Sequence, residues 1–119
     1  MEIEQFDPDS IIQGLLHSDD YTNRVGGSCI YGCPRCGHRI RFKWRNFHKS
    51  DHRSFLKHDV RPLFDNITPD NPYDKQGFID FHCPTCNAPT RIIFSINDYT
   101  FLAFHFEIEL VLVGERQAQ

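Results

Sequence analysis

Two short cysteine motifs constrain this chain more than any other feature. Residues 33–36 (Cys-Pro-Arg-Cys) and 83–86 (Cys-Pro-Thr-Cys) share one spacing, and both place proline after the first cysteine. The proline restricts the backbone φ angle and favours a tight turn between the cysteines. Gly37 and Asn87 follow the motifs, and both residue types tolerate the left-handed conformation needed to leave such a turn. Each motif is therefore predicted to present two sulfur atoms at one turn.

The remaining cysteine content favours a metal over disulfide bonds. The chain has five cysteines, and Cys29 is the one outside the motifs. The first nine residues are acidic and lack the apolar segment of a secretory signal, so we expect a cytoplasmic protein. Reducing compartments keep thiols free, whereas four thiolates suit tetrahedral zinc. We predict one structural zinc ion bound by Cys33, Cys36, Cys83 and Cys86.

A zinc ion with four sulfur ligands has no open coordination position. Catalytic zinc normally keeps one position for water or substrate, so the predicted site cannot activate water. The sequence also shows no pairing of a nucleophile with a base and no glycine-rich phosphate loop. His38 and His82 adjoin the motifs and are candidates for supporting contacts. We therefore expect that the protein is not an enzyme.

Other uses of these residues stay open at this point. His48 and His52 complete a Cys-x2-Cys-x11-His-x3-His spacing with the first motif, which would leave the second motif without a role. The same two histidines, four residues apart, could hold a second metal on a helix. A Cys-x-x-Cys pair can be a redox dithiol, although no thioredoxin-like βαβ pattern precedes either motif. Iron can also occupy a site made of four cysteines.

Hydrophobic periodicity predicts a mainly β, small α+β fold with an antiparallel sheet of about five strands. The expected strands cover residues 28–32, 39–45, 77–82, 90–96 and 99–113. In the second of these strands, apolar residues alternate with basic ones, which indicates a half-buried strand. Its inward face would hold Ile40, Phe42 and Trp44, and its outward face Arg39, Arg41, Lys43 and Arg45.

The last expected strand is long and also alternates. One face would carry its apolar residues, and the other face its acids. The apolar set is Leu102, Phe104, Phe106, Ile108, Leu110 and Leu112, and the opposite set is His105, Glu107 and Glu109. If this strand lay beside residues 39–45, Glu107 and Glu109 would pair with the basic residues and the charges would form only a sheet surface.

The length of 119 residues predicts a single domain over residues 1–119. Residues 1–27 form an acidic lead-in with a short helix, capped by Asp9 or Ser10 and burying Ile11, Ile12, Leu15 and Leu16. Residues 46–76 form an insertion, with a short helix over 50–60 that buries Phe55 and Leu56, followed by a proline-rich loop. Residues 115–119 form a polar tail. No apolar run is long enough for a membrane-spanning helix.

The two motifs, each between predicted strands, resemble the zinc-ribbon group, in which two knuckles on β-hairpins share one ion. The resemblance covers about residues 28–47 and 77–113, and it implies that the four motif cysteines occupy the ligand positions. The interval between the motifs exceeds the 15–20 residues or so usual in such sites, and the excess falls in the insertion. Zinc ribbons serve in transcription, translation and protein docking, so the resemblance implies a fold more than a function.

Charge offers two hypotheses about a partner. The formal net charge is −3, yet residues 35–61 carry nine of the thirteen basic residues. The basic side chains of the strand at 39–45 could follow a nucleic-acid backbone, but its aromatic residues alternate away from them and the chain is acidic. We therefore favour a protein-binding module, such as an adaptor, an inhibitor or an immunity-type protein that neutralises a partner, with nucleic-acid binding as the alternative.

Overall fold

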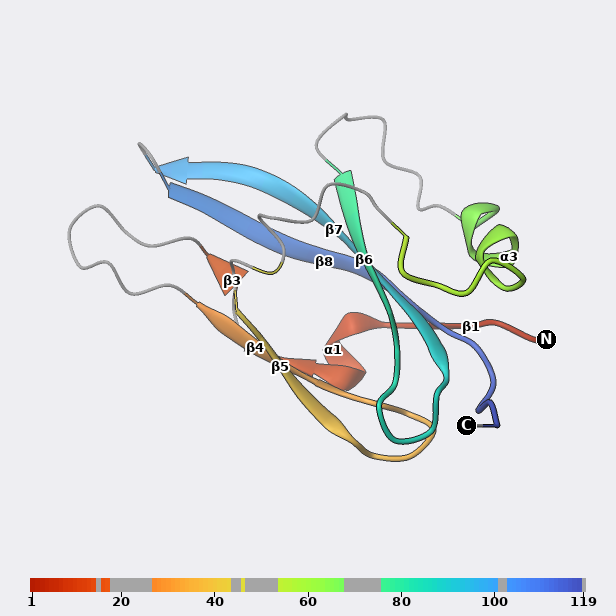
Figure 1. Cartoon of the computed structure of the whole chain (residues 1–119). Coiled ribbons are helices and arrows are strands. Elements are labelled where there is room, and N and C mark those ends of the chain that lie inside the picture. Colours follow the sequence, from red (N-terminus) through yellow and green to blue (C-terminus); the bar gives the residue numbers. More distant parts are fainter. Residues whose placement is uncertain are drawn as a thin grey trace.

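A computed structural model describes residues 1–14, 16–17, 27–43, 46, 54–67, 76–100 and 103–118. These residues form eight strands and two short helices, which confirms the predicted mainly β, small α+β class. The strands divide between two antiparallel sheets instead of forming one (Figure 1). No helix within the described ranges is long and apolar enough to cross a membrane.

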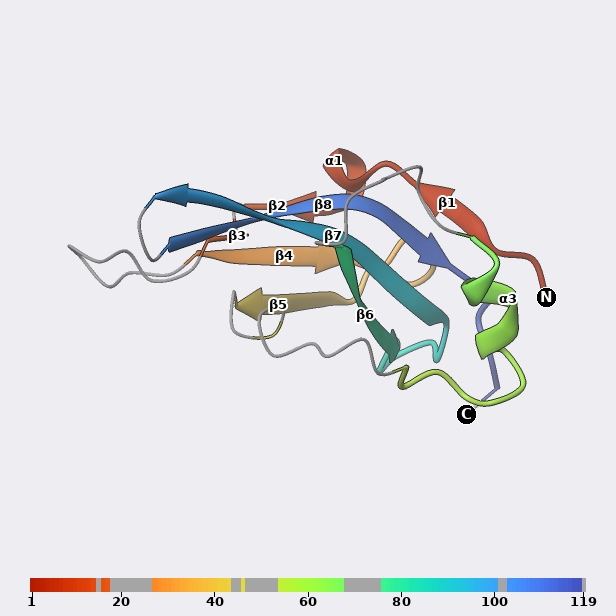
Figure 2. The same cartoon turned by 90° about the horizontal axis from the view of Figure 1, so that it is seen from above.

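The larger sheet has the strand order β1-β8-β7-β6, and β3 also pairs with β8. Its strands are β1 Glu4–Phe6, β3 Leu16–His17, β6 Gln76–His82, β7 Pro89–Thr100 and β8 Ala103–Val113. The smaller sheet has the order β2-β4-β5, with β2 Ile12–Gln13, β4 Ser28–Gly32 and β5 Arg39–Lys43. The expected strands are therefore present, but residues 99–100 end β7 and do not begin β8. In Figure 2, β4 and β5 of the smaller sheet lie to one side of β7 and β8 of the larger sheet.

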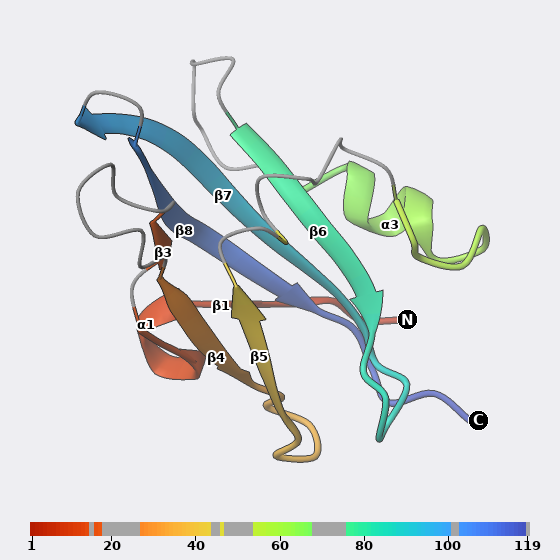
Figure 3. The ribbon, with the colours of Figure 1, turned by 60° about the vertical axis from the view of Figure 1, so that its left-hand side comes forward.

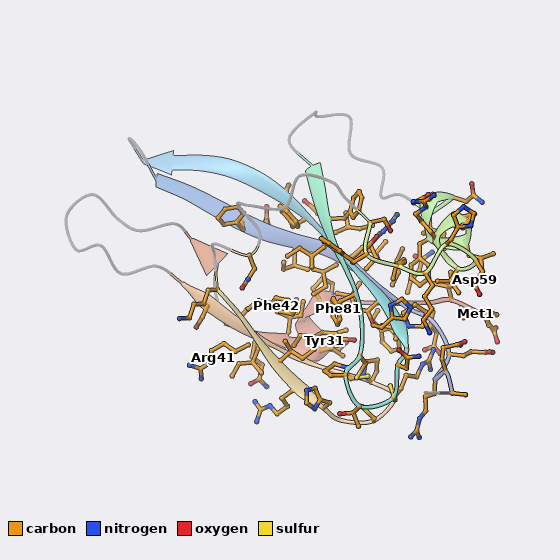
Figure 4. All side chains as sticks on the ribbon, viewed as in Figure 1. Met1, Tyr31, Arg41, Phe42, Asp59 and Phe81 are labelled. Carbon is orange, nitrogen blue, oxygen red and sulfur yellow. The ribbon has the colours of Figure 1, made fainter. Side chains whose placement is uncertain are left out.

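The main apolar cluster fills the space between the two sheets. Tyr31 from β4 is fully buried, and its ring meets that of Phe81 from β6 edge-on at 5.6 Å between centroids. Phe42 from β5 packs on the same Phe81 ring at 5.5 Å. Figure 4 shows these three rings together, with Arg41 directed away from them. The predicted alternation of β5 is confirmed over residues 39–43, whereas Trp44 and Arg45 lie outside the described residues.

A β-bulge divides β8 into two segments whose side chains alternate in opposite directions. Ile93 pairs with Leu110 and Phe94 pairs with Ile108, so Glu109 is an extra residue in β8. Phe106 and Ile108 consequently belong to the cluster between the sheets, while Leu110 and Leu112 belong to a second cluster on the opposite face. The prediction that these apolar residues share one face is therefore wrong, because an extra residue reverses the side-chain alternation. Leu102 lies outside the described residues, and the Phe104 side chain is not described.

The opposite face of the larger sheet is covered by part of the insertion, centred on helix α3, Arg61–Asp65 (Figure 3). Phe64 from this helix is fully buried. The predicted helix over 50–60 is wrong for residues 54–60, which precede α3, and residues 50–53 lie outside the described part. The helix starts later because Pro62 fits a first helical turn, where its missing N–H costs nothing. Leu56 is buried as predicted, but Phe55 is 72% exposed.

The N-terminal helix is shorter than predicted. Helix α1 spans Pro8–Ile11, and its cap is Asp7, whose carboxylate accepts a hydrogen bond from the Asp9 N–H at 3.0 Å. The predicted caps, Asp9 and Ser10, lie inside the helix. Ile12 already belongs to β2 and Leu16 to β3, so the predicted apolar helix face does not form. Pairing with β4 and β8 has overridden the local helical pattern, and Leu15 lies outside the described residues.

Candidate metal centre

The structure brings the four motif cysteines together. Cys33 and Cys36 lie in the turn between β4 and β5, and Cys83 and Cys86 lie in the turn between β6 and β7. All four Sγ atoms lie within 4.8 Å of one another. Two Sγ–Sγ distances between the turns are 3.8 Å and 3.6 Å, for the pairs Cys33–Cys86 and Cys36–Cys83. Tetrahedral zinc with Zn–S bonds of about 2.3 Å requires sulfur separations of about 3.8 Å.

The two turns have the same backbone geometry. In the first, the Cys33 N–H donates to His38 O at 2.8 Å and the Gly37 N–H donates to Cys33 O at 2.8 Å. In the second, the equivalent bonds join Cys83 to Ala88 at 3.0 Å and Asn87 to Cys83 at 2.8 Å. Gly37 has a φ angle of 81° and Asn87 one of 60°, which confirms the predicted left-handed exits.

The ionisation behaviour of the thiols favours a cation. The pKa of Cys86 is raised to about 12, mainly by burial. Burial also raises the pKa of Cys33. For Cys83, burial acts in the same direction but is outweighed by hydrogen bonds from the backbone of Cys86 and Thr85, so its pKa is lowered. Closely packed thiolates need a compensating positive charge, which a divalent metal supplies.

Several contacts hold the two turns in place. His38 of the first turn and Thr85 of the second share a hydrogen bond of 2.9 Å between Nδ1 and Oγ1, so His38 makes the supporting contact expected of it. Arg35 extends from the first turn to the larger sheet, where its guanidinium donates to Gly114 O at 3.1 Å and pairs with Glu4 at 3.0 Å. The predicted C-terminal tail also lies here, because the Gln117 N–H donates to Cys86 O at 3.1 Å.

Tyr31 supplies an orphaned polar atom next to the sulfur cluster. Its hydroxyl is buried and makes no hydrogen bond of good geometry among the described residues. Burial raises the pKa of Tyr31, the Thr90 hydroxyl opposes that shift, and the neighbouring Cys33 and Cys83 thiols add to it. A hydroxyl donor facing these sulfurs fits metal-bound thiolates, which accept hydrogen bonds. Sequence reasoning missed this residue, although the alternation of β4 places it inward, two residues before Cys33.

The basic residues predicted for a partner lie apart from the sulfur cluster. Arg39, Arg41 and Lys43 project from the outer face of the smaller sheet, and Arg45 lies outside the described residues. For the described residues 39–43, the alternative cross-strand pairing with Glu107 and Glu109 is wrong, because both acids lie on β8 of the larger sheet and β5 pairs with β4. The cations instead face three uncharged residues of the neighbouring strand β4. Arg39 pairs with Gly32, Arg41 with Ile30 and Lys43 with Ser28.

A hollow of about 370 Å³ lies beside this basic strand on the same outer face. It is bounded by α1, β2, β4 and the first cysteine turn, with Arg39 at its rim. The lining consists of Ser10, Ile11, Gln13, Ile30, Gly32, Cys33, Gly37 and Arg39.

No protein-family model, curated protein or solved structure matches the chain. The resemblance to zinc ribbons therefore rests on the paired cysteine turns alone. The alternative ligands His48 and His52 lie outside the described residues, so their role stays a prediction.

Proposed function

We propose that this protein is a zinc-clamped binding module that recognises another protein through the outer face of its smaller sheet. The observation that carries the proposal is the origin of the four sulfur atoms. One pair comes from the turn of the smaller sheet and the other from the turn of the larger sheet. A metal bound to all four would join the two layers at the end where β4, β5, β6 and β7 turn (Figure 1).

Zinc fits this donor set better than other ions do. Tetrahedral sites of four thiolates are typical of structural zinc, and zinc has no redox chemistry that the protein would need to control. A metal with four sulfur ligands lacks the exchangeable position that hydrolytic zinc enzymes use. We therefore propose a structural and non-catalytic role for the metal, and we look for the function on the protein surface.

The metal proposal is tested by element analysis of the purified protein. We expect one zinc per chain, with a chelator removing both the metal and the cooperative unfolding transition. Replacing Cys83 and Cys86 together by Ser should abolish zinc binding. Cys29→Ser should leave one zinc per chain, because Cys29 is buried and is not one of the four clustered sulfur ligands. Full zinc content in the double variant, with loss only on replacing His48 and His52, would identify a different ligand set. Bound iron with its visible absorption would refute zinc.

The outer face of the smaller sheet supports a protein partner. Its cations, Arg39, Arg41 and Lys43, are exposed, and Phe42 is turned into the core against Phe81. Proteins that bind single-stranded nucleic acid combine cations with aromatic rings on the same surface, and the described part of this face has no such ring. Protein partners need only complementary charge and shape. The adaptor, inhibitor and immunity-type roles, and the cytoplasmic location, stay predictions.

Nucleic-acid binding is the second candidate, because three cations in one row could follow a phosphate backbone. A double charge reversal, Arg41→Glu with Lys43→Glu, separates the candidates. We expect the wild-type protein to bind an acidic polypeptide. At physiological salt, it should bind a fluorescent twenty-nucleotide DNA or RNA only weakly. Tight oligonucleotide binding that weakens with salt and disappears on charge reversal would favour the nucleic-acid function instead.

A further inference from the structure

Strand β5 forms an edge of the smaller sheet. The strand order is β2-β4-β5, so among the described residues β5 pairs only with β4. An edge strand presents a row of backbone N–H and C=O groups that another strand can bind. The direction of these groups in β5 follows from the register.

The backbone groups of Arg39 and Arg41 point to the open side. Cys33 and His38 form a hydrogen-bonded pair at the start of the hairpin. Bonded and non-bonded pairs alternate along an antiparallel ladder, so Ile40 and Phe42 bond to β4, whereas Arg39, Arg41 and Lys43 direct their backbone groups away from it. The Lys43 N–H agrees with this, because it donates to the Asn46 side chain at 2.8 Å, off the ladder.

The charge of the same strand restricts what can bind there. The side chains of Arg39, Arg41 and Lys43 are exposed on one face of β5, at the edge that offers the backbone groups. A second copy of β5 would place like charges opposite one another, which destabilises a strand pair. A nucleic acid could contact the cations but could not continue the backbone ladder. An extended polypeptide with acids at alternate positions satisfies both the backbone and the side chains.

We propose that an extended acidic segment of a protein partner adds to the open edge of β5 as a further strand. Its backbone bonds to the N–H and C=O groups of Arg39 and Arg41, and its alternate acidic side chains lie beside the cations of Arg39, Arg41 and Lys43. This inference rests on the proposed protein-binding function and specifies its mode and partner chemistry. Figure 4 shows Arg41 projecting into the open on this side of the molecule.

The probe is the capped peptide acetyl-(Glu-Val)4-amide, which places all its acids on one face when extended. It is titrated into zinc-loaded full-length protein while amide chemical shifts are recorded by NMR. We expect shifts concentrated in residues 39–43 and slower hydrogen exchange at the Arg39 and Arg41 amides. The peptide acetyl-(Lys-Val)4-amide is the control and should cause no such shifts at the same concentration.

Two changes separate backbone addition from simple charge attraction. Arg41→Pro removes an edge N–H that β4 does not use, while Arg41→Gln keeps the N–H and removes only the charge. We expect Arg41→Pro to weaken binding about tenfold beyond Arg41→Gln, which is the order of one lost hydrogen bond. Zinc content and the unfolding midpoint show whether the proline variant is folded. If the proline variant does not fold, two N-methylated peptides test the wild-type protein instead. One peptide is methylated on the backbone nitrogen of every Glu, and the other on the backbone nitrogen of every Val. One of the two should bind, and the other should fail to bind.

The outcomes distinguish the mode of binding from the function. Equal binding by both methylated peptides, or shifts centred on Ser10 and Gln13 in the hollow, would overturn addition to β5 while leaving a protein-binding face. Dimerisation of the protein alone, lost on Arg41→Pro, would make a second copy the occupant of the edge. If the acidic peptide shifts no residue between 39 and 43 while a single-stranded oligonucleotide does, both the inference and the proposed protein-binding function fail.

Discussion

The ion pair between Asp80 and Arg91 gives the sharpest stability prediction. The two residues face each other across β6 and β7, on the side of the larger sheet that α3 covers. Arg91 donates two parallel hydrogen bonds to the Asp80 carboxylate, at 2.7 Å and 2.8 Å. Both residues are buried, with exposures of 2% for Asp80 and 4% for Arg91. The guanidinium also lies over the Phe78 ring, 4.2 Å from its centroid.

Replacing Asp80 by Asn removes the charge but keeps the shape of the side chain. Breaking a buried pair from one side costs about 3–5 kcal/mol, because the remaining charge stays desolvated without its buried counter-charge. Asn retains one acceptor for Arg91, so we expect a loss of about 3 kcal/mol. Arg91 also pairs with Asp65 of α3 at 2.9 Å, but the Asp65 side chain is 51% exposed. Asp65→Asn should therefore cost only about 0–1 kcal/mol.

The two variants form a matched pair for equilibrium unfolding in urea, measured on zinc-loaded protein by circular dichroism. A loss of about 3 kcal/mol is a large part of the 5–15 kcal/mol typical of a whole domain, so the shift in midpoint should be plain. Replacing both partners, Asp80→Leu with Arg91→Met, should recover most of the loss, since no buried charge remains. Equal effects of Asp80→Asn and Asp65→Asn would refute the assignment of Asp80 as the buried counter-charge.

Three further predictions concern single residues near the core and the metal centre. Tyr31→Phe should keep zinc and fold but release zinc severalfold faster to a competing chelator, because the thiolates lose a donor; an unchanged rate would assign the hydroxyl another partner. Asn87→Ala should cost about 1–2 kcal/mol relative to Asn87→Gly in urea unfolding, because its φ is 60°. Burial raises the pKa of Cys29 to about 11 from 9.0, so above pH 9 the unfolded chain binds fewer protons than the native one. Stability should therefore fall by about 2–3 kcal/mol between pH 9 and 11, and Cys29→Ala should lack that part of the fall.

The features that follow from local chemistry were predictable from the sequence. The left-handed exits at Gly37 and Asn87 depend only on which residues tolerate a positive φ, and both are present. The alternation of β5 also follows from its own residues, and the structure retains it. The convergence of the two cysteine motifs required one further assumption, that four thiols separated along the chain share one metal. The sulfur distances agree with it.

The features that sequence reasoning missed are non-local. The bulge at Glu109 depends on how β8 pairs with β7, and only that pairing shows that Ser95 donates to the Glu109 carboxylate at 2.8 Å. Likewise, Asp80 is an acid at an inward-facing strand position, and only the register with Arg91 shows what neutralises it. The separation into two sheets has the same origin, because local alternation indicates that a segment is a strand but the neighbours of that strand are set by tertiary pairing.

The metal centre and the proposed partner edge are connected through the chain itself. Gly37 leaves the first cysteine turn, and β5 begins at Arg39, with the Cys33–His38 hydrogen bond as the first rung of its ladder. The position of the Arg39 backbone groups is therefore tied to the geometry of the sulfur site. If the four cysteines bind a metal as proposed, its removal would leave the turn without an ion to hold it, and the edge of β5 would lose the conformation proposed for binding. Metal occupancy and partner affinity should thus be thermodynamically linked, so a metal without chemistry of its own can still influence function.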